Sequence, residues 1–121
     1  HGQDLESLKI PLYTEVYEID GPYFFGIANK FDDISRRTSS GEQKVRIIRM
    51  RKVSFIDATG IHNLEIFVDA SLANGRKIIL SGVNEKVLHS LDRSGIVAKV
   101  GKDNILDNIH AALDRSFEVA K

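Results

Sequence analysis

The sequence predicts a single α/β domain with a mixed sheet, an N-terminal β-hairpin followed by parallel β-α units, and about four helices. The first reason is size and composition, since 121 residues with 42% apolar and 28% charged side chains suit one compact core. The second is the β-α-β-α-β-α order after residue 44, which implies right-handed crossovers and a largely parallel sheet. The third is an alternating, aromatic-rich start, which is typical of a hairpin.

The hairpin is expected in the first 25 residues. Residues 11–19 alternate between two faces, as a strand does, and residues 20–22 read Asp-Gly-Pro, which is turn chemistry. Residues 23–25, Tyr-Phe-Phe, would be the returning strand. Phe31 and Ile34 then lie three apart in a polar background, which predicts a short helix.

The next strand is predicted over residues 44–50, and residues 53–56 carry the chain to a boundary at Asp57. Positive charge is concentrated around this strand, at Lys44, Arg46, Arg49, Arg51 and Lys52. Such a cluster could meet an acidic partner, a lipid headgroup or a nucleotide phosphate. Charges that alternate with apolar strand residues more often mark solvated edges and ends, and this is the interpretation we favour here.

A long helix is predicted over residues 58–74, because apolar side chains recur at helical spacing at Ile61, Leu64, Val68 and Leu72. Asn74 and Gly75 supply the left-handed stop that commonly follows a last turn. Residues 77–80 are a short apolar run of the kind a buried parallel strand shows, ending at Ser81-Gly82.

Asn84 is expected to cap the next helix, which carries Val87, Leu88 and Leu91 and closes at Ser94-Gly95. Residues 96–100 are predicted to form one more strand. Asp103 or Asn104 would then cap a last helix, whose apolar positions are Ile105, Leu106, Ile109, Leu113 and Phe117.

Composition and motifs argue against several classes of function. Lys plus Arg equals Asp plus Glu at 17 each, so the chain has no overall field for nucleic acid or an acidic membrane, and it has no cysteine. Phosphate-binding, nucleophile-elbow and zinc-protease motifs are absent, and His62, His89 and His110 fall in three different predicted helices. We therefore expect no enzyme activity, no cofactor, no metal and no nucleic-acid partner.

The ends of the chain are also interpreted from the sequence. Residues 1–2, His-Gly, resemble a cloning remnant, so residues 3–121 are taken as the single domain and as a piece of a longer protein. The apolar stretches fall far short of the roughly 20 residues that span a bilayer, and we expect the fragment itself to be soluble.

The most informative stretch is residues 54–61, Ser-Phe-Ile-Asp-Ala-Thr-Gly-Ile, where a strand gives way to an amphipathic helix. The first N–H groups of a helix carry partial positive charge, so this corner could bind an anion or present the hydroxyl of Thr59 for phosphorylation. The simpler interpretation is that Asp57 or Thr59 caps the helix, which does not exclude a second role.

Together, the hairpin, the corner and the β-α units resemble the STAS domain, a family shared by anti-sigma factor antagonists and the cytoplasmic tails of SulP sulfate permeases. In the antagonists the corner reads Asp-Ser-Ser-Gly or Asp-Ser-Thr-Gly, and its first serine is phosphorylated; here that position is Ala58. Three other segments are more similar to the permease branch: residues 20–29, residues 80–84, and residues 94–96 followed by Asn104-Ile105.

The resemblance implies a STAS-type, non-catalytic regulatory domain at the cytoplasmic face of a SulP-type anion transporter, attached to the membrane portion of the same polypeptide and binding a regulatory protein or a small ligand such as a nucleotide. The alternative is a free-standing anti-sigma factor antagonist, against which Ala58 argues. The expected contact surface is the corner with the following helix face: Asp57, Ala58, Thr59, Gly60, His62, Asn63 and Glu65.

Overall fold

The computed structural model describes residues 13–19 and 44–120. The returning strand predicted at residues 23–25 and the short helix predicted around Phe31 and Ile34 lie outside these ranges. The antiparallel part of the predicted mixed sheet therefore lies outside them as well.

The described sheet is parallel throughout, which agrees with the β-α alternation of the sequence. Its strands stand in the order β1-β2-β3-β4, and they are β1 (Thr14–Glu18), β2 (Val45–Arg49), β3 (Lys77–Ser81) and β4 (Ile105–Leu106). The register aligns the last residues of the first three strands, with Glu18 opposite Arg49 and Arg49 opposite Ser81. Three strands therefore end at one common level.

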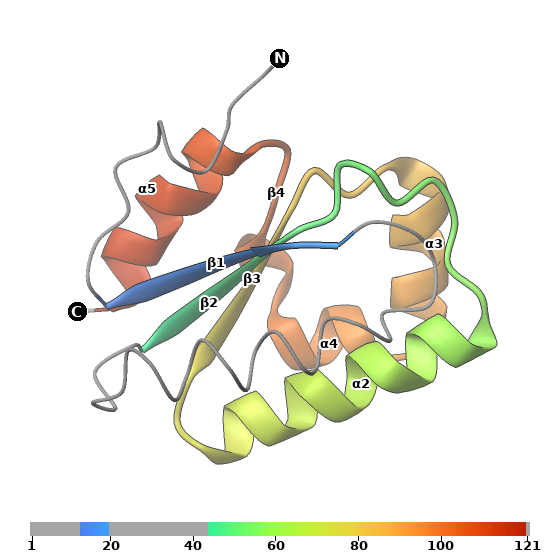
Figure 1. The fold of residues 1–121 in the computed structure, drawn as a ribbon, viewed down its shortest axis with the longest axis horizontal. Coiled ribbons are helices and arrows are strands. Elements are labelled where there is room, and N and C mark those ends of the chain that lie inside the picture. The colour runs from blue at the N-terminus through green and yellow to red at the C-terminus, as the bar shows by residue number, and fades with distance from the viewer. Residues whose placement is uncertain (1–12, 20–43, 121) are drawn as a thin grey trace.

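Helices cover both faces of this sheet (Figure 1). They are α2 (Ala58–Ala73), α3 (Glu85–Arg93), α4 (Ile96–Val100) and α5 (Ile109–Val119). Helix α5 lies on one face, and α2, α3 and α4 lie on the other (Figure 1). This three-layer arrangement is the usual way to bury a parallel sheet on both sides.

The larger core lies between the sheet and the three helices α2, α3 and α4. Ile48 and Leu80 contribute from the strands, Leu64 and Val68 from α2, and Leu91 from α3, and each is at most 1% exposed. Burying one such side chain stabilises the fold by about 1.5–3 kcal/mol relative to leaving it in water. The smaller core beneath α5 is formed by Val45, Ile47, Ile79, Ile109 and Ala112.

The predicted strand over residues 96–100 is wrong, because these residues form helix α4. Gly95 adopts a left-handed φ of 91° and redirects the chain, and the buried residues Ile96, Val97 and Val100 then follow helical spacing. A run of β-branched residues favours a strand locally, but packing against α2 and α3 overrides that preference.

The predicted start of the last helix is also wrong. Ile105 and Leu106 form β4, and Leu80 pairs with Ile105 in the ladder. Helix α5 begins after Asn108, whose side chain accepts a hydrogen bond from the N–H of Ala111. Residues 105–106, which the apolar spacing assigned to the first turn of the last helix, therefore form strand β4.

The prediction of a solvated basic strand is wrong for two of its five residues. Arg46 and Arg49 are only 9% and 3% exposed. Strand β2 lies between β1 and β3 with helices on both faces, so its charged side chains are buried and are paired with Glu15 and Glu18 of β1. Lys44, Arg51 and Lys52 lie beyond the strand ends and are exposed.

The buried face of α2 differs from the predicted set of apolar residues at one position. Leu72 is 37% exposed, and Ser71 takes the buried place next to it. The Ser71 hydroxyl accepts a hydrogen bond from Arg46 Nη1 at 2.9 Å. A polar side chain is used there because it satisfies a buried guanidinium.

Candidate functional site

The strand expected to lead directly into the corner is wrong, because β2 ends at Arg49 and residues 50–57 form no strand. The corner itself, residues 57–60 at the start of α2, has the geometry of a capped helix start. Asp57 is extended at the N-cap, and its Oδ1 accepts a hydrogen bond from the N–H of Gly60 at 2.9 Å. Between the two candidates for the cap, the structure selects Asp57, and Thr59 is exposed on the first turn. Gly60 is buried, so it closes the corner and offers no side chain to a partner.

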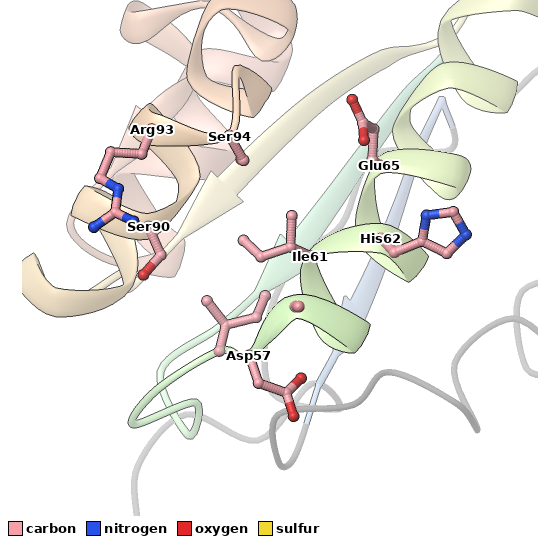
Figure 2. Close-up of a pocket in the computed structure, with 9 residues that line it drawn as sticks. Asp57, Ile61, His62, Glu65, Ser90, Arg93 and Ser94 are labelled. Atoms are coloured by element: carbon pink, nitrogen blue, oxygen red, sulfur yellow. The ribbon is translucent and has the colours of Figure 1, made fainter.

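A groove of about 430 Å³ lies beside this corner, between the start of α2 and the end of α3. Its lining residues are Ile56, Asp57, Ala58, Ile61, His62, Glu65, Ser90, Arg93 and Ser94. Figure 2 shows Ile61 between the two walls, with Ser90, Arg93 and Ser94 on the α3 side. The groove therefore has an apolar floor with polar walls.

The structure brings four of the seven predicted contact residues to this groove: Asp57, Ala58, His62 and Glu65. Thr59, Gly60 and Asn63 do not line it. The His62 ring points away from α3 (Figure 2). The predicted surface is thus only part of one wall.

The second wall, formed by Ser90, Arg93 and Ser94, was missed by reasoning from the sequence. The available signal was the polar face of α3, because crossovers of one hand place α2 and α3 on the same side of the sheet. Arg93 is exposed in the last turn of α3 and is the one arginine or lysine among the groove's lining residues.

Glu65 forms an ion pair with Lys99 of helix α4. Lys99 Nζ lies 2.7 Å from Glu65 Oε2 and 2.9 Å from Asp69 Oδ1. Hydrogen bonds to these two carboxylates raise the pKa of Lys99 above its ordinary value. Pairing with Lys99 positions Glu65 at the groove and reduces the negative charge it presents there.

Metal binding and membrane crossing find no support in the described ranges. No group of three or more His, Asp or Glu side chains within residues 13–19 and 44–120 could hold a metal ion. Within the same ranges, no helix combines the length and the hydropathy needed to cross a bilayer.

Comparison with known proteins identifies the family. A family model described as STAS domain matches residues 8–112. The chain belongs to the STAS domain family. A solved structure of a sulfate transporter family protein from Wolinella succinogenes has a TM-score of 0.82 and 34% identity, covering 96% of this chain and 94% of that one.

Two further relatives connect this STAS domain with transporters. The SulP transporter STAS domain from Vibrio cholerae has a TM-score of 0.81 at 31% identity, covering 92% of this chain and 86% of that one. The probable sulfate transporter 4.2 of Arabidopsis thaliana is 27% identical over an alignment of 110 residues, and the match covers 81% of this chain. The STAS domain spans only 16% of that transporter's length. The chain is thus similar to domains that are part of much larger transporter polypeptides.

The cap of this STAS domain gives a first testable prediction. Replacing Asp57 with alanine removes the acceptor for the Gly60 N–H, so we expect a loss of about 1 kcal/mol in the free energy of unfolding. Urea denaturation monitored by circular dichroism measures it. Asp57→Ser is the matched control and should retain most of the stability; an Asp57→Ala variant as stable as the wild type would contradict the capping role.

Proposed function

We propose that this STAS domain is a non-catalytic regulatory module at the cytoplasmic face of a SulP-type anion transporter, and that it acts by docking a partner in the groove between α2 and α3. The transporter assignment is supported by the relatives of similar fold, which include the SulP transporter STAS domain. The docking role is supported by the groove itself, which joins the corner of α2 to an arginine of α3.

The composition of the groove suits a protein partner. Ile61 offers a partly buried apolar contact, and Arg93 and Asp57 offer charges of opposite sign at its walls. Central apolar contacts surrounded by polar groups, with an arginine among them, are typical of protein interfaces. We propose the membrane portion of the same transporter as the partner.

The corner of this chain is unsuited to the phosphorylation switch of the antagonists. Ala58 has no oxygen that could accept a phosphoryl group, and it lines the groove at the position of the usual serine. Thr59 is exposed but does not line the groove. We therefore propose that regulation occurs through docking and not through modification at the corner.

The full reading frame tests the transporter assignment. We expect it to encode several apolar spans of about 20 residues in addition to this domain. A frame that encodes no such span would contradict the transporter assignment and would favour a free-standing regulator.

A charge reversal tests the docking role. In the full-length protein reconstituted in proteoliposomes, we expect Arg93→Glu to lower uptake of labelled sulfate per molecule, since losing an arginine that anchors an interface costs about 2 kcal/mol of binding. Lys86→Glu is the matched control, because Lys86 is exposed on the same helix and does not line the groove. Equal uptake by both variants, with unchanged thermal stability, would contradict docking at this groove.

A further inference from the structure

A second cavity lies on the opposite face of the sheet, where the strands end beside the start of α5. Its volume is about 390 Å³, and it shares no lining residue with the groove of α2 and α3. It is lined by Arg49, Arg51, Ser81, Gly82, Asp107, Asn108, Ile109 and His110. A volume of this size lies within the range of small-molecule sites, and open α/β sheets bind ligands just beyond the carboxyl ends of their strands.

The strand residues facing α5 change from apolar to polar at this edge. Glu18, Arg49 and Ser81 occupy the last positions of β1, β2 and β3 and are aligned in register. Two positions earlier on the same face, the side chains are Val16, Ile47 and Ile79. Since burying polar side chains is unfavourable unless they are partnered, a row of them beside a cavity points to a polar site.

Positive charge exceeds negative charge around the cavity. The Glu18 carboxylate forms ion pairs with three cations, at 3.0 Å from Arg51 Nε, 3.5 Å from Lys52 Nζ and 3.8 Å from Arg49 Nη1. Asp107 is the one carboxylate among the lining residues. The lining of the cavity thus holds two arginines, Arg49 and Arg51, and one carboxylate, and this composition favours an anion.

Burial and the neighbouring Arg51 cation affect the pKa values of both Glu18 and Arg49. Burial alone would raise the pKa of Glu18, but the hydrogen bond from Arg51 and the surrounding positive charges together lower it below its ordinary value. Burial and the neighbouring Arg51 cation lower the pKa of Arg49, and Glu18 offsets this only in part. The two guanidinium groups thus repel each other beside the cavity.

Arg51 is positioned by close packing against the end of β3. Gly82 has a φ of 73°, and a Cβ atom at that position would lie 3.1 Å from Arg51 Cβ. Of the nitrogen atoms of Arg51, only Nε donates a hydrogen bond to the Glu18 carboxylate. The two Nη groups of Arg51 have no hydrogen-bond partner among the described residues. A planar guanidinium with open Nη donors suits a tetrahedral oxyanion.

The start of α5 forms the opposite wall and adds to this arrangement. Asn108 caps the helix through the N–H of Ala111, and Ile109 and His110 of the first turn line the cavity. First-turn N–H groups carry partial positive charge. The cavity and its two arginines carry the inference, and the helix start increases the attraction.

We propose that this cavity binds a small tetrahedral oxyanion, either free sulfate or phosphate or the phosphate end of a small phosphomonoester. Arg51 supplies the hydrogen-bonding fork, and Arg49 supplies a buried charge. Ser81 also lines the cavity and supplies a hydroxyl. This site shares no lining residue with the groove of α2 and α3, so an anion can bind here while a partner is docked in that groove.

The test is a titration of the ¹⁵N-labelled chain with sulfate, inorganic phosphate and glycerol 3-phosphate, followed by NMR at constant ionic strength set with sodium chloride. We expect saturable shifts at the amides of residues 107–111 and at Arg51 Nε. Arg51→Gln should weaken binding about tenfold or more, because a hydrogen bond to a charged group contributes roughly 1.5–3 kcal/mol. Arg93→Gln, in the other groove, is the matched control and should bind as the wild type does.

Arg51 is chosen for the variant because its side chain is 40% exposed, whereas Arg49 is buried and its loss could unfold the domain. Tighter binding of glycerol 3-phosphate than of phosphate would assign a phosphomonoester, and equal or weaker binding would assign the free anion. Shifts that do not saturate, or an Arg51→Gln variant that binds as tightly as the wild type, would overturn the proposal.

Discussion

Replacing Arg46 with alanine is expected to destabilise the domain by about 3–5 kcal/mol, because it leaves a buried carboxylate without its counter-ion. Arg46 Nε donates to Glu15 Oε1 at 2.9 Å, and the two side chains are only 11% and 4% exposed. The guanidinium also lies 5.1 Å from the ring centroid of Phe67. Urea denaturation of the variant measures the loss, which is large for a domain of this size.

A double variant separates the broken pair from lost packing. Arg46→Met combined with Glu15→Leu removes both charges and keeps apolar volume, and such replacements are often neutral or stabilising. The described residues support this expectation, since Glu15 Oε2 is buried and has no hydrogen-bond partner among them. If Arg46→Ala and the double variant were equally unstable, the cost would come from packing, and the explanation by an unpaired charge would be wrong.

Replacing Leu64 with alanine is the second change with a large expected effect. Leu64 is 1% exposed and anchors α2, which carries the corner, against the larger core. Truncating a buried leucine removes its transfer free energy and leaves a cavity, which together destabilise by about 2–5 kcal/mol. Thermal and urea unfolding should both show the loss.

The same helix provides the control. Ile66 is two residues further along α2 and is 55% exposed, so Ile66→Ala should change the free energy of unfolding by no more than about 0.5 kcal/mol. Equal losses for the two variants would mean that the buried face of α2 is wrongly assigned.

The elements that were predicted well are those whose pattern and local chemistry agree. The strand at residues 77–80 extends by one residue, and the helix expected over residues 58–74 is α2. Asn84 caps α3 as predicted, with its side chain accepting from the N–H of Val87 at 2.8 Å. At these positions short-range signals specify the same structure that packing requires.

The region after α3 shows where local signals fail. Asn104, expected as a possible helix cap, instead donates to the Val100 carbonyl at 2.9 Å and accepts from Arg115 Nε at 2.8 Å. It thus joins the end of α4 to α5. The partner of β4 is β3, about 25 residues earlier in the chain, and a pairing of that kind leaves no local periodicity.

The candidate site was only half predictable for the same reason. Asp57 and Ala58 were found because the capped start of a helix has a recognisable local sequence, although the strand expected directly before it is absent and β2 ends at Arg49. Arg93 and Arg51 were not assigned to cavities, because their importance depends on which elements the fold brings together. The burial of Arg49 likewise follows from the central place of β2 and not from its neighbours in sequence.

The shortness of β4 has a consequence for self-association. It pairs with β3 through only two residues, Ile105 and Leu106, and the chain then turns into α5. A long exposed edge strand is a template on which other chains can add strands and aggregate, and a very short one offers almost no ladder to extend. This margin of the sheet is therefore protected against the addition of β-strands from neighbouring molecules.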